Sequence, residues 1–98
     1  MHSFQVHELA EKVVAWSNEY ARYSEEYGKI LAQKAIRWTE FRAQEDCKSD
    51  KMADKWWDTT PEGIKEMSLR LKMKALEKQM SAARSLIRVA EGEARNQF

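Results

Sequence analysis

The chain has 98 residues and a formal net charge of +1, with 34% charged and 10% aromatic residues, three glycines and one proline. This composition is typical of a soluble helical protein and argues against a disordered or β-sheet protein. A single cysteine, Cys47, excludes an internal disulfide. Residues 1–9 lack the pattern of a signal peptide, and no stretch approaches the roughly 20 apolar residues of a membrane span. We therefore expect a cytoplasmic protein without a membrane contact.

The first predicted helix covers about residues 4–46. Eight apolar residues there recur in steps of three and four: Val6, Leu9, Val13, Trp16, Tyr20, Tyr23, Tyr27 and Ile30. Such a row, which we call a seam, forms the side of a helix that packs lengthwise against another helix. Beyond Gly28 we expect the apolar stripe to shift to Leu31, Ala35, Trp38 and Phe41, marking a bend or a change of packing partner.

A polar connector is predicted at about residues 47–60, with one or two helical turns between Lys51 and Trp57. A helix start follows, because Thr60 is a suitable N-cap and Pro61 suits the first helical position. The second long helix is therefore expected at about residues 61–95. Its seam consists of Leu69, Met73, Leu76, Met80, Ala83, Ile87, Ala90 and Ala94.

These elements predict an all-α fold in one domain, residues 1–98. Its architecture is an elongated hairpin of two long helices joined by a short connecting helix. A hairpin of this size buries little surface, so we expect the seams to assemble the chain into a homo-oligomeric bundle. The predicted oligomer seam is formed by Val13, Trp16, Tyr20, Tyr23, Tyr27, Leu69, Met73, Leu76, Met80 and Ile87.

Positive charge gathers in the second half of the chain. Between residues 65 and 88 there are seven basic and two acidic side chains, a local net charge of +5. Around a helix, the side chains of Lys74, Lys78, Arg84 and Arg88 fall within about 80° of Arg70. A row of cations can bind a phosphate backbone without reading its sequence. The alternative interpretation is an ordinary solvated helix face, on which Glu77 and Glu91 at its edge partly neutralise the positive charge.

A tandem tryptophan, Trp56–Trp57, lies in the connector beside Lys51 and Lys55. Aromatic rings next to cations stack on the bases of single-stranded nucleic acid. The other interpretation is that at least one of the two rings anchors the core. A further basic group, Lys34, Arg37 and Arg42, borders Trp38 and Phe41, and either extends the basic surface or covers apolar surface with its aliphatic stems.

No catalytic or metal-binding pattern is apparent. His7 and Glu11 are four residues apart, but no second such pair accompanies them. A glycine-rich phosphate loop and a Ser/His/Asp set are both missing. We predict no enzymatic activity, no cofactor and no metal.

Three segments resemble the small helical proteins encoded in phage recombination modules and, more distantly, UvsY-type recombination mediators. They are ILAQKAIRWTEFR (residues 30–42), the connector beginning KSDK, and KALEKQMSAARSLIRVAEGEAR in the last helix. The resemblance implies an oligomer that binds single-stranded DNA and helps a recombinase load onto strands covered by single-strand-binding protein, in the host cytoplasm. It also implies DNA contacts at Lys34, Arg37, Arg42 and residues 48–55. The chain is shorter than those mediators, and its tandem tryptophan has no assigned counterpart.

We therefore predict a single-stranded nucleic-acid-binding oligomer in phage DNA recombination or replication, acting as a recombinase-loading mediator. Its partners would be itself, single-stranded DNA, and a recombinase or single-strand-binding protein. The predicted nucleic-acid contacts are Lys34, Arg37, Arg42, Lys51, Lys55, Trp56, Trp57, Arg70, Lys74, Lys78, Arg84 and Arg88. One alternative is a helical protein-binding module, such as a phage inhibitor or adaptor of a host or defence protein. Another is a structural coiled-coil assembly subunit.

Overall fold

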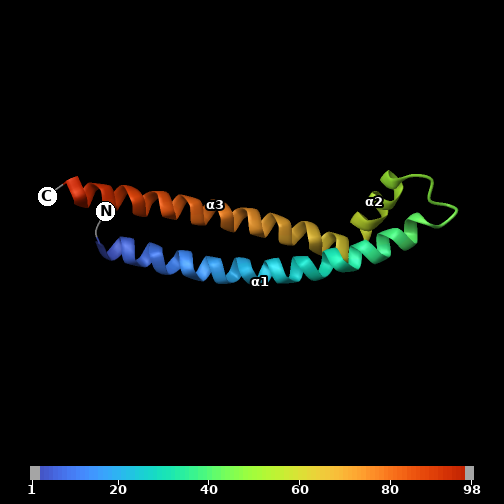
Figure 1. The fold of residues 1–98 in the computed structure, drawn as a ribbon, viewed down its shortest axis with the longest axis horizontal. Helices are drawn as coiled ribbons and strands as arrows, with labels where there is room; N and C mark the ends of the chain where they lie inside the picture. Colours follow the sequence, from blue (N-terminus) through green and yellow to red (C-terminus); the bar gives the residue numbers. More distant parts are fainter. Residues whose placement is uncertain (1–2, 97–98) are drawn as a thin grey trace. The chain divides into compact units, whose positions relative to one another are not determined.

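The computed structural model describes residues 3–96, with side chains for residues 5–93. It contains three helices, α1 (Ser3–Arg42), α2 (Asp50–Thr59) and α3 (Pro61–Asn96), and no strand within the described range (Figure 1). The all-α prediction is confirmed. The predicted seam position Ala94 lies outside the described side chains.

The chain leaves α1 earlier than expected, at Arg42 instead of near residue 46. The Arg42 guanidinium holds the turn closed, because Nε bonds Asp50 Oδ1 at 2.8 Å and Nη1 donates to the carbonyl of Cys47 at 3.3 Å. Helix α2 then begins after Ser49, whose hydroxyl accepts the backbone N–H of Met52 at 3.2 Å. The connector is therefore more helical than the one or two turns predicted.

The junction of α2 and α3 is a tight backbone turn. As predicted, α3 begins at Pro61 after Thr60. The Thr60 hydroxyl donates to the carbonyl of Trp57 at 2.6 Å and accepts the N–H of Gly63 at 3.0 Å, so one side chain satisfies groups of both helices. Gly63 lies so close to the end of α2 that a Cβ there would overlap the carbonyl oxygen of Trp57 and sit 2.7 Å from its carbonyl carbon.

The chain divides into two compact units. The terminal unit comprises residues 1–22 and 73–98, and the central unit comprises residues 23–72. In the terminal unit α1 and α3 run antiparallel: Ser17 Oγ donates to Met80 Sδ at 3.3 Å, and Tyr20 OH donates to Glu77 Oε1 at 2.7 Å. The seam of α3 is buried there at Leu76, Met80, Ala83 and Ala90, and half-buried at Met73 and Ile87.

The central unit has its own apolar core. Ile30 of α1, Trp57 of α2 and Leu69 of α3 form it, and Trp57 is completely buried, with 0% of its surface exposed. The half-buried rings that pack against this core are Tyr23, Tyr27, Trp38 and Trp56. Of the predicted oligomer seam, Val13, Trp16 and Tyr20 are half-buried in the terminal unit.

The predicted shift of the α1 stripe is found only in part, because Trp38 and Phe41 are half-buried whereas Leu31 and Ala35 are exposed. The three- and four-residue steps of the seam also continue after Ile30, through Lys34, Arg37 and Phe41, all half-buried. The two cations fit at seam positions because carboxylates of α3 face them: Lys34 pairs with Glu66 and Arg37 with Glu62. Charged pairs thus replace apolar contacts at these seam positions of the central unit.

Candidate nucleic-acid interface

A buried carboxylate forms ion pairs with two of the predicted phosphate-binding cations. Glu66 is 2% exposed, with Oε1 lying 3.2 Å from Lys34 Nζ and Oε2 lying 3.1 Å from Arg70 Nη2. Removing either cation would leave part of a buried negative charge uncompensated, which is costly in a protein interior. Lys34 and Arg70 therefore have a structural role that competes with any phosphate contact.

Arg37 is held by a second carboxylate and by two aromatic rings. Its Nη1 lies 2.8 Å from Glu62 Oε2, and its guanidinium carbon lies 5.7 Å from the Trp56 ring centroid and 5.6 Å from that of Trp57. The hydrogen bond from Arg37 lowers the pKa of Glu62 below its ordinary value. This ion pair ties α1 to the first turn of α3.

The lowered pKa of Glu62 predicts a pH-dependent contribution to stability. A depressed folded-state pKa stabilises the fold above the unfolded-state value near 4.5, and this stabilisation is lost as the pH falls through the folded-state value. We expect Glu62→Gln to lower the melting temperature at pH 7 and the difference from wild type to shrink at pH 3. Thermal melts across that range, with the exposed Glu40→Gln as the control, measure it. A difference that stays constant with pH would contradict this assignment.

The tandem tryptophan belongs mainly to the core. Trp57 is fully buried and has Lys34 Nζ 5.9 Å from its ring centroid, so its ring faces no solvent. Trp56 is half-buried and stacks on Phe41, with ring centroids 4.4 Å apart and planes 4° from parallel. Of the two interpretations of this motif, core anchoring describes Trp57.

Arg42 also has an internal role, since it closes the turn after α1. Its hydrogen bond to Asp50 raises the pKa of the guanidinium above its ordinary value. By contrast, Lys51 and Lys55 on α2 are exposed and form no ion pair within the part of the chain described.

Four exposed cations form a row on α3 of the terminal unit, which we call the α3 cation row: Lys74, Lys78, Arg84 and Arg88. They fall within an arc of about 120° around the helix. The exposed hydroxyls of Ser81 and Ser85 lie within the same arc. None of the four cations forms an ion pair with another residue in the range 3–96.

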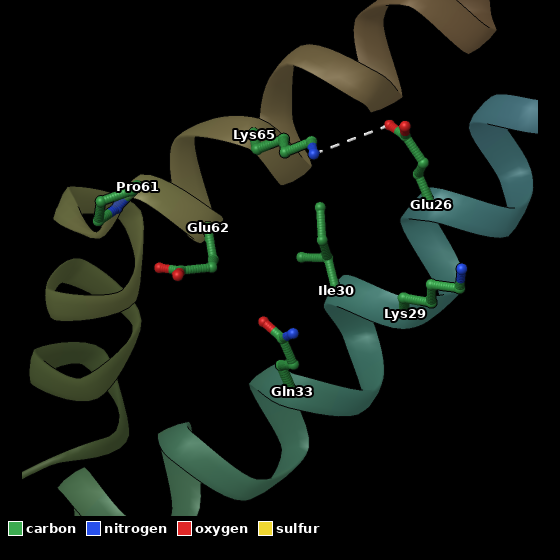
Figure 2. A pocket seen from close by; sticks show the side chains of 7 residues that line it. All are labelled: Glu26, Lys29, Ile30, Gln33, Pro61, Glu62 and Lys65. Carbon is green, nitrogen blue, oxygen red and sulfur yellow. Dashed lines mark ion pairs between the residues drawn. The ribbon is translucent and has the colours of Figure 1, made fainter.

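A pocket of about 360 Å³ in the central unit is bordered by charges that are already paired (Figure 2). Ile30 points from α1 toward α3 at its centre, and Lys65 Nζ lies 4.0 Å from Glu26 Oε2 across the opening. Lys29 pairs with Glu25 at 3.7 Å. What remains is an apolar floor with the amide of Gln33, which is not a catalytic set.

The described residues contain no group of three or more His, Cys, Asp or Glu side chains that could hold a metal. His7 Nε2 and Glu11 Oε1 lie 3.0 Å apart as an exposed pair within one helix. Among residues 3–96, no helix is long and apolar enough to cross a membrane.

Glu66 is the residue that the sequence analysis missed. It lies three residues before Leu69, so it continues the seam of α3 toward the N-terminus with an acidic side chain. Lys34 and Arg37 likewise continue the seam of α1 beyond Ile30. The sequence signal for these ion pairs was therefore an acidic residue on the α3 seam together with basic residues on the α1 seam.

No family model, no curated protein and no solved structure matches this chain. The resemblance to recombination mediators is therefore carried only by the three segments quoted above.

Proposed function

We propose that this protein binds single-stranded nucleic acid, without enzymatic activity, through the α3 cation row of the terminal unit. The observation that carries the proposal is a contrast in charge pairing. In the central unit, six cations lie in ion pairs: Lys29, Lys34, Arg37, Arg42, Lys65 and Arg70. The α3 cation row has no such partner within the described range.

Unpaired cations bind phosphates at lower cost than paired ones. A phosphate that contacts Lys34 or Arg70 competes with buried Glu66, whereas a phosphate at Arg84 or Arg88 displaces only water and counterions. The row extends about 21 Å along the straight helix axis. A flexible single strand can follow such a line, while the backbone of a duplex curves away from it.

The wider role rests on the resemblance. An oligomer that loads a recombinase onto covered single strands in phage recombination or replication would need a sequence-independent grip on the strand. The α3 cation row, with Lys51 and Lys55 as further exposed cations on α2, supports such a grip. A recombinase or a single-strand-binding protein would then be the protein partner.

Charge-matched double variants test the proposal. Arg84→Gln with Arg88→Gln removes two charges from the row, and Lys12→Gln with Arg22→Gln removes two exposed charges from α1 of the same unit. In fluorescence anisotropy with a labelled single-stranded oligonucleotide, the row variant should bind more weakly. Its log–log salt slope should be lower by about 0.7 for each phosphate that the variant no longer neutralises.

The control variant should keep the wild-type salt slope, and a duplex titrated in parallel should bind less tightly than the single strand. If the two double variants bound equally weakly, net charge alone would explain the loss of affinity. That result would contradict a binding site at the α3 cation row. No binding by wild type at low salt would refute the function and leave the protein-binding and structural-assembly alternatives.

A further inference from the structure

The helix face that carries the α3 cation row presents charges and hydroxyls. Besides the four cations, the residues within its arc are Glu77, Ser81, Ser85 and Gly92. The carboxylate of Glu77 accepts the hydroxyl of Tyr20 on α1 at 2.7 Å. Gln79 is the one amide side chain between residues 73 and 93, and it falls about 100° outside the arc. The groups that a ligand meets along the row are therefore cations and small hydroxyls.

Aromatic rings are absent from this helix. Proteins that bind single strands commonly combine cations with rings that stack on the bases, but none of the 36 residues of α3 is Phe, Trp or Tyr. On α1 of the terminal unit, the described rings are Trp16 and Tyr20, both half-buried in the seam. In the central unit, Trp57 is fully buried and Trp56 stacks on Phe41. A strand that lies along the row thus meets no aromatic ring on α3.

We propose that the α3 cation row binds a linear chain of phosphates, with no contribution from base or sugar. The inference rests on the proposed function, because it names the chemical group that the same site recognises. The cations neutralise phosphates and release counterions, and the hydroxyls of Ser81 and Ser85 donate hydrogen bonds to phosphate oxygens. Single-stranded nucleic acid and inorganic polyphosphate both supply such a chain, so the two should compete for the row.

Two members of the row, Arg84 and Arg88, are able to stack on a base as well, because a guanidinium is planar. A lysine ammonium keeps the charge and binds phosphate as a point charge. Replacing both arginines by lysine therefore separates charge from stacking. We expect Arg84→Lys with Arg88→Lys to bind an oligonucleotide within about twofold of wild type, because the charge that displaces counterions is unchanged.

Fluorescence anisotropy with two labelled ligands of equal length tests the proposal. One is a mixed-sequence single-stranded oligonucleotide, and the other is an abasic chain with the same number of phosphates. Wild type should bind both with dissociation constants within about twofold of each other and with the same salt slope, because both offer the same phosphates. Unlabelled inorganic polyphosphate should displace both at an equal concentration of phosphate.

The charge-removing variants locate this binding on the row. Arg84→Gln with Arg88→Gln should weaken binding of the oligonucleotide and of the abasic chain by the same factor. Lys12→Gln with Arg22→Gln is the matched control, and it should bind both ligands with the wild-type salt slope. A control variant that loses as much affinity as the row variant would overturn the assignment of the phosphate chain to α3.

The outcomes distinguish this inference from the function on which it rests. An oligonucleotide that binds at least about fivefold more tightly than the abasic chain would show a stacked base, which overturns the inference and leaves the proposed function standing. Polyphosphate that fails to displace the oligonucleotide would overturn it in the same way. Polyphosphate binding without oligonucleotide binding would refute the proposed function and identify polyphosphate as the ligand. Binding of none of the three would overturn both.

Discussion

Replacing Trp57 with alanine is expected to cost about 3–5 kcal/mol of folding free energy, as large-to-small changes at fully buried aromatic positions do. Trp57 has 0% exposure and joins Ile30 and Leu69 in the core of the central unit. Small domains have only about 5–15 kcal/mol of stability in total. Urea unfolding followed by circular dichroism measures the loss, which should remove much of the cooperative transition.

Two further substitutions test whether the stability depends on a large ring at position 57 and not on its indole N–H or on the neighbouring tryptophan. The Trp57 indole N–H has no hydrogen-bond partner among the described residues, so Trp57→Phe should cost far less than Trp57→Ala. Trp56→Ala, at the half-buried neighbour that stacks on Phe41, should also cost less. If Trp56→Ala destabilised the protein as much as Trp57→Ala, the assignment of Trp57 as the central core residue would be wrong.

A single added methyl group at Gly63 should produce the second large effect. The new Cβ would overlap the carbonyl oxygen of Trp57, which is backbone and cannot rotate away. The α2–α3 turn must then open, which also weakens the Thr60 bonds to Trp57 and Gly63. Overpacking of this kind costs about 1–3 kcal/mol, and we expect a value at the upper end of that range.

The other two glycines provide matched controls. A Cβ at Gly28 or Gly92 has no atom within 4 Å outside its own helix backbone. Exchanging glycine for alanine in a helix interior gains about 0.5–1 kcal/mol, so both control variants should melt at a higher temperature than wild type. In thermal melts, the melting temperature should therefore fall for Gly63→Ala and rise for Gly28→Ala and Gly92→Ala. A neutral or stabilising Gly63→Ala would show that the turn is looser than described.

The sequence was most informative where one local signal acted alone. The start of α3 followed from the Thr60–Pro61 pair, and the helical packing of both long segments followed from their seams. The end of α1 was predicted too late, because it depends on Arg42 reaching Asp50 and the Cys47 carbonyl across a turn. Such an interaction has no periodic signature in the sequence.

The candidate site was harder to predict, because a basic residue looks the same in sequence whether or not it is paired. Lys34 and Arg70 were grouped with Arg84 and Arg88 as phosphate ligands, and only the fold shows that the first two share Glu66. The pairing could have been inferred had both seams been extended through their charged positions. The α3 cation row carries no comparable acidic neighbour on a facing seam.

The charged seam positions also limit how the hairpin can align as it forms. If α1 of the central unit slid by one heptad along α3, Lys34 would face Met73 and Arg37 would face Leu69, so Lys34 would lose Glu66 and Arg37 would lose Glu62. Two uniformly apolar seams would tolerate such a slip at small cost, whereas unpaired charges at seam positions penalise it strongly. The ion pairs therefore favour one register of α1 against α3 among several that apolar packing alone would allow.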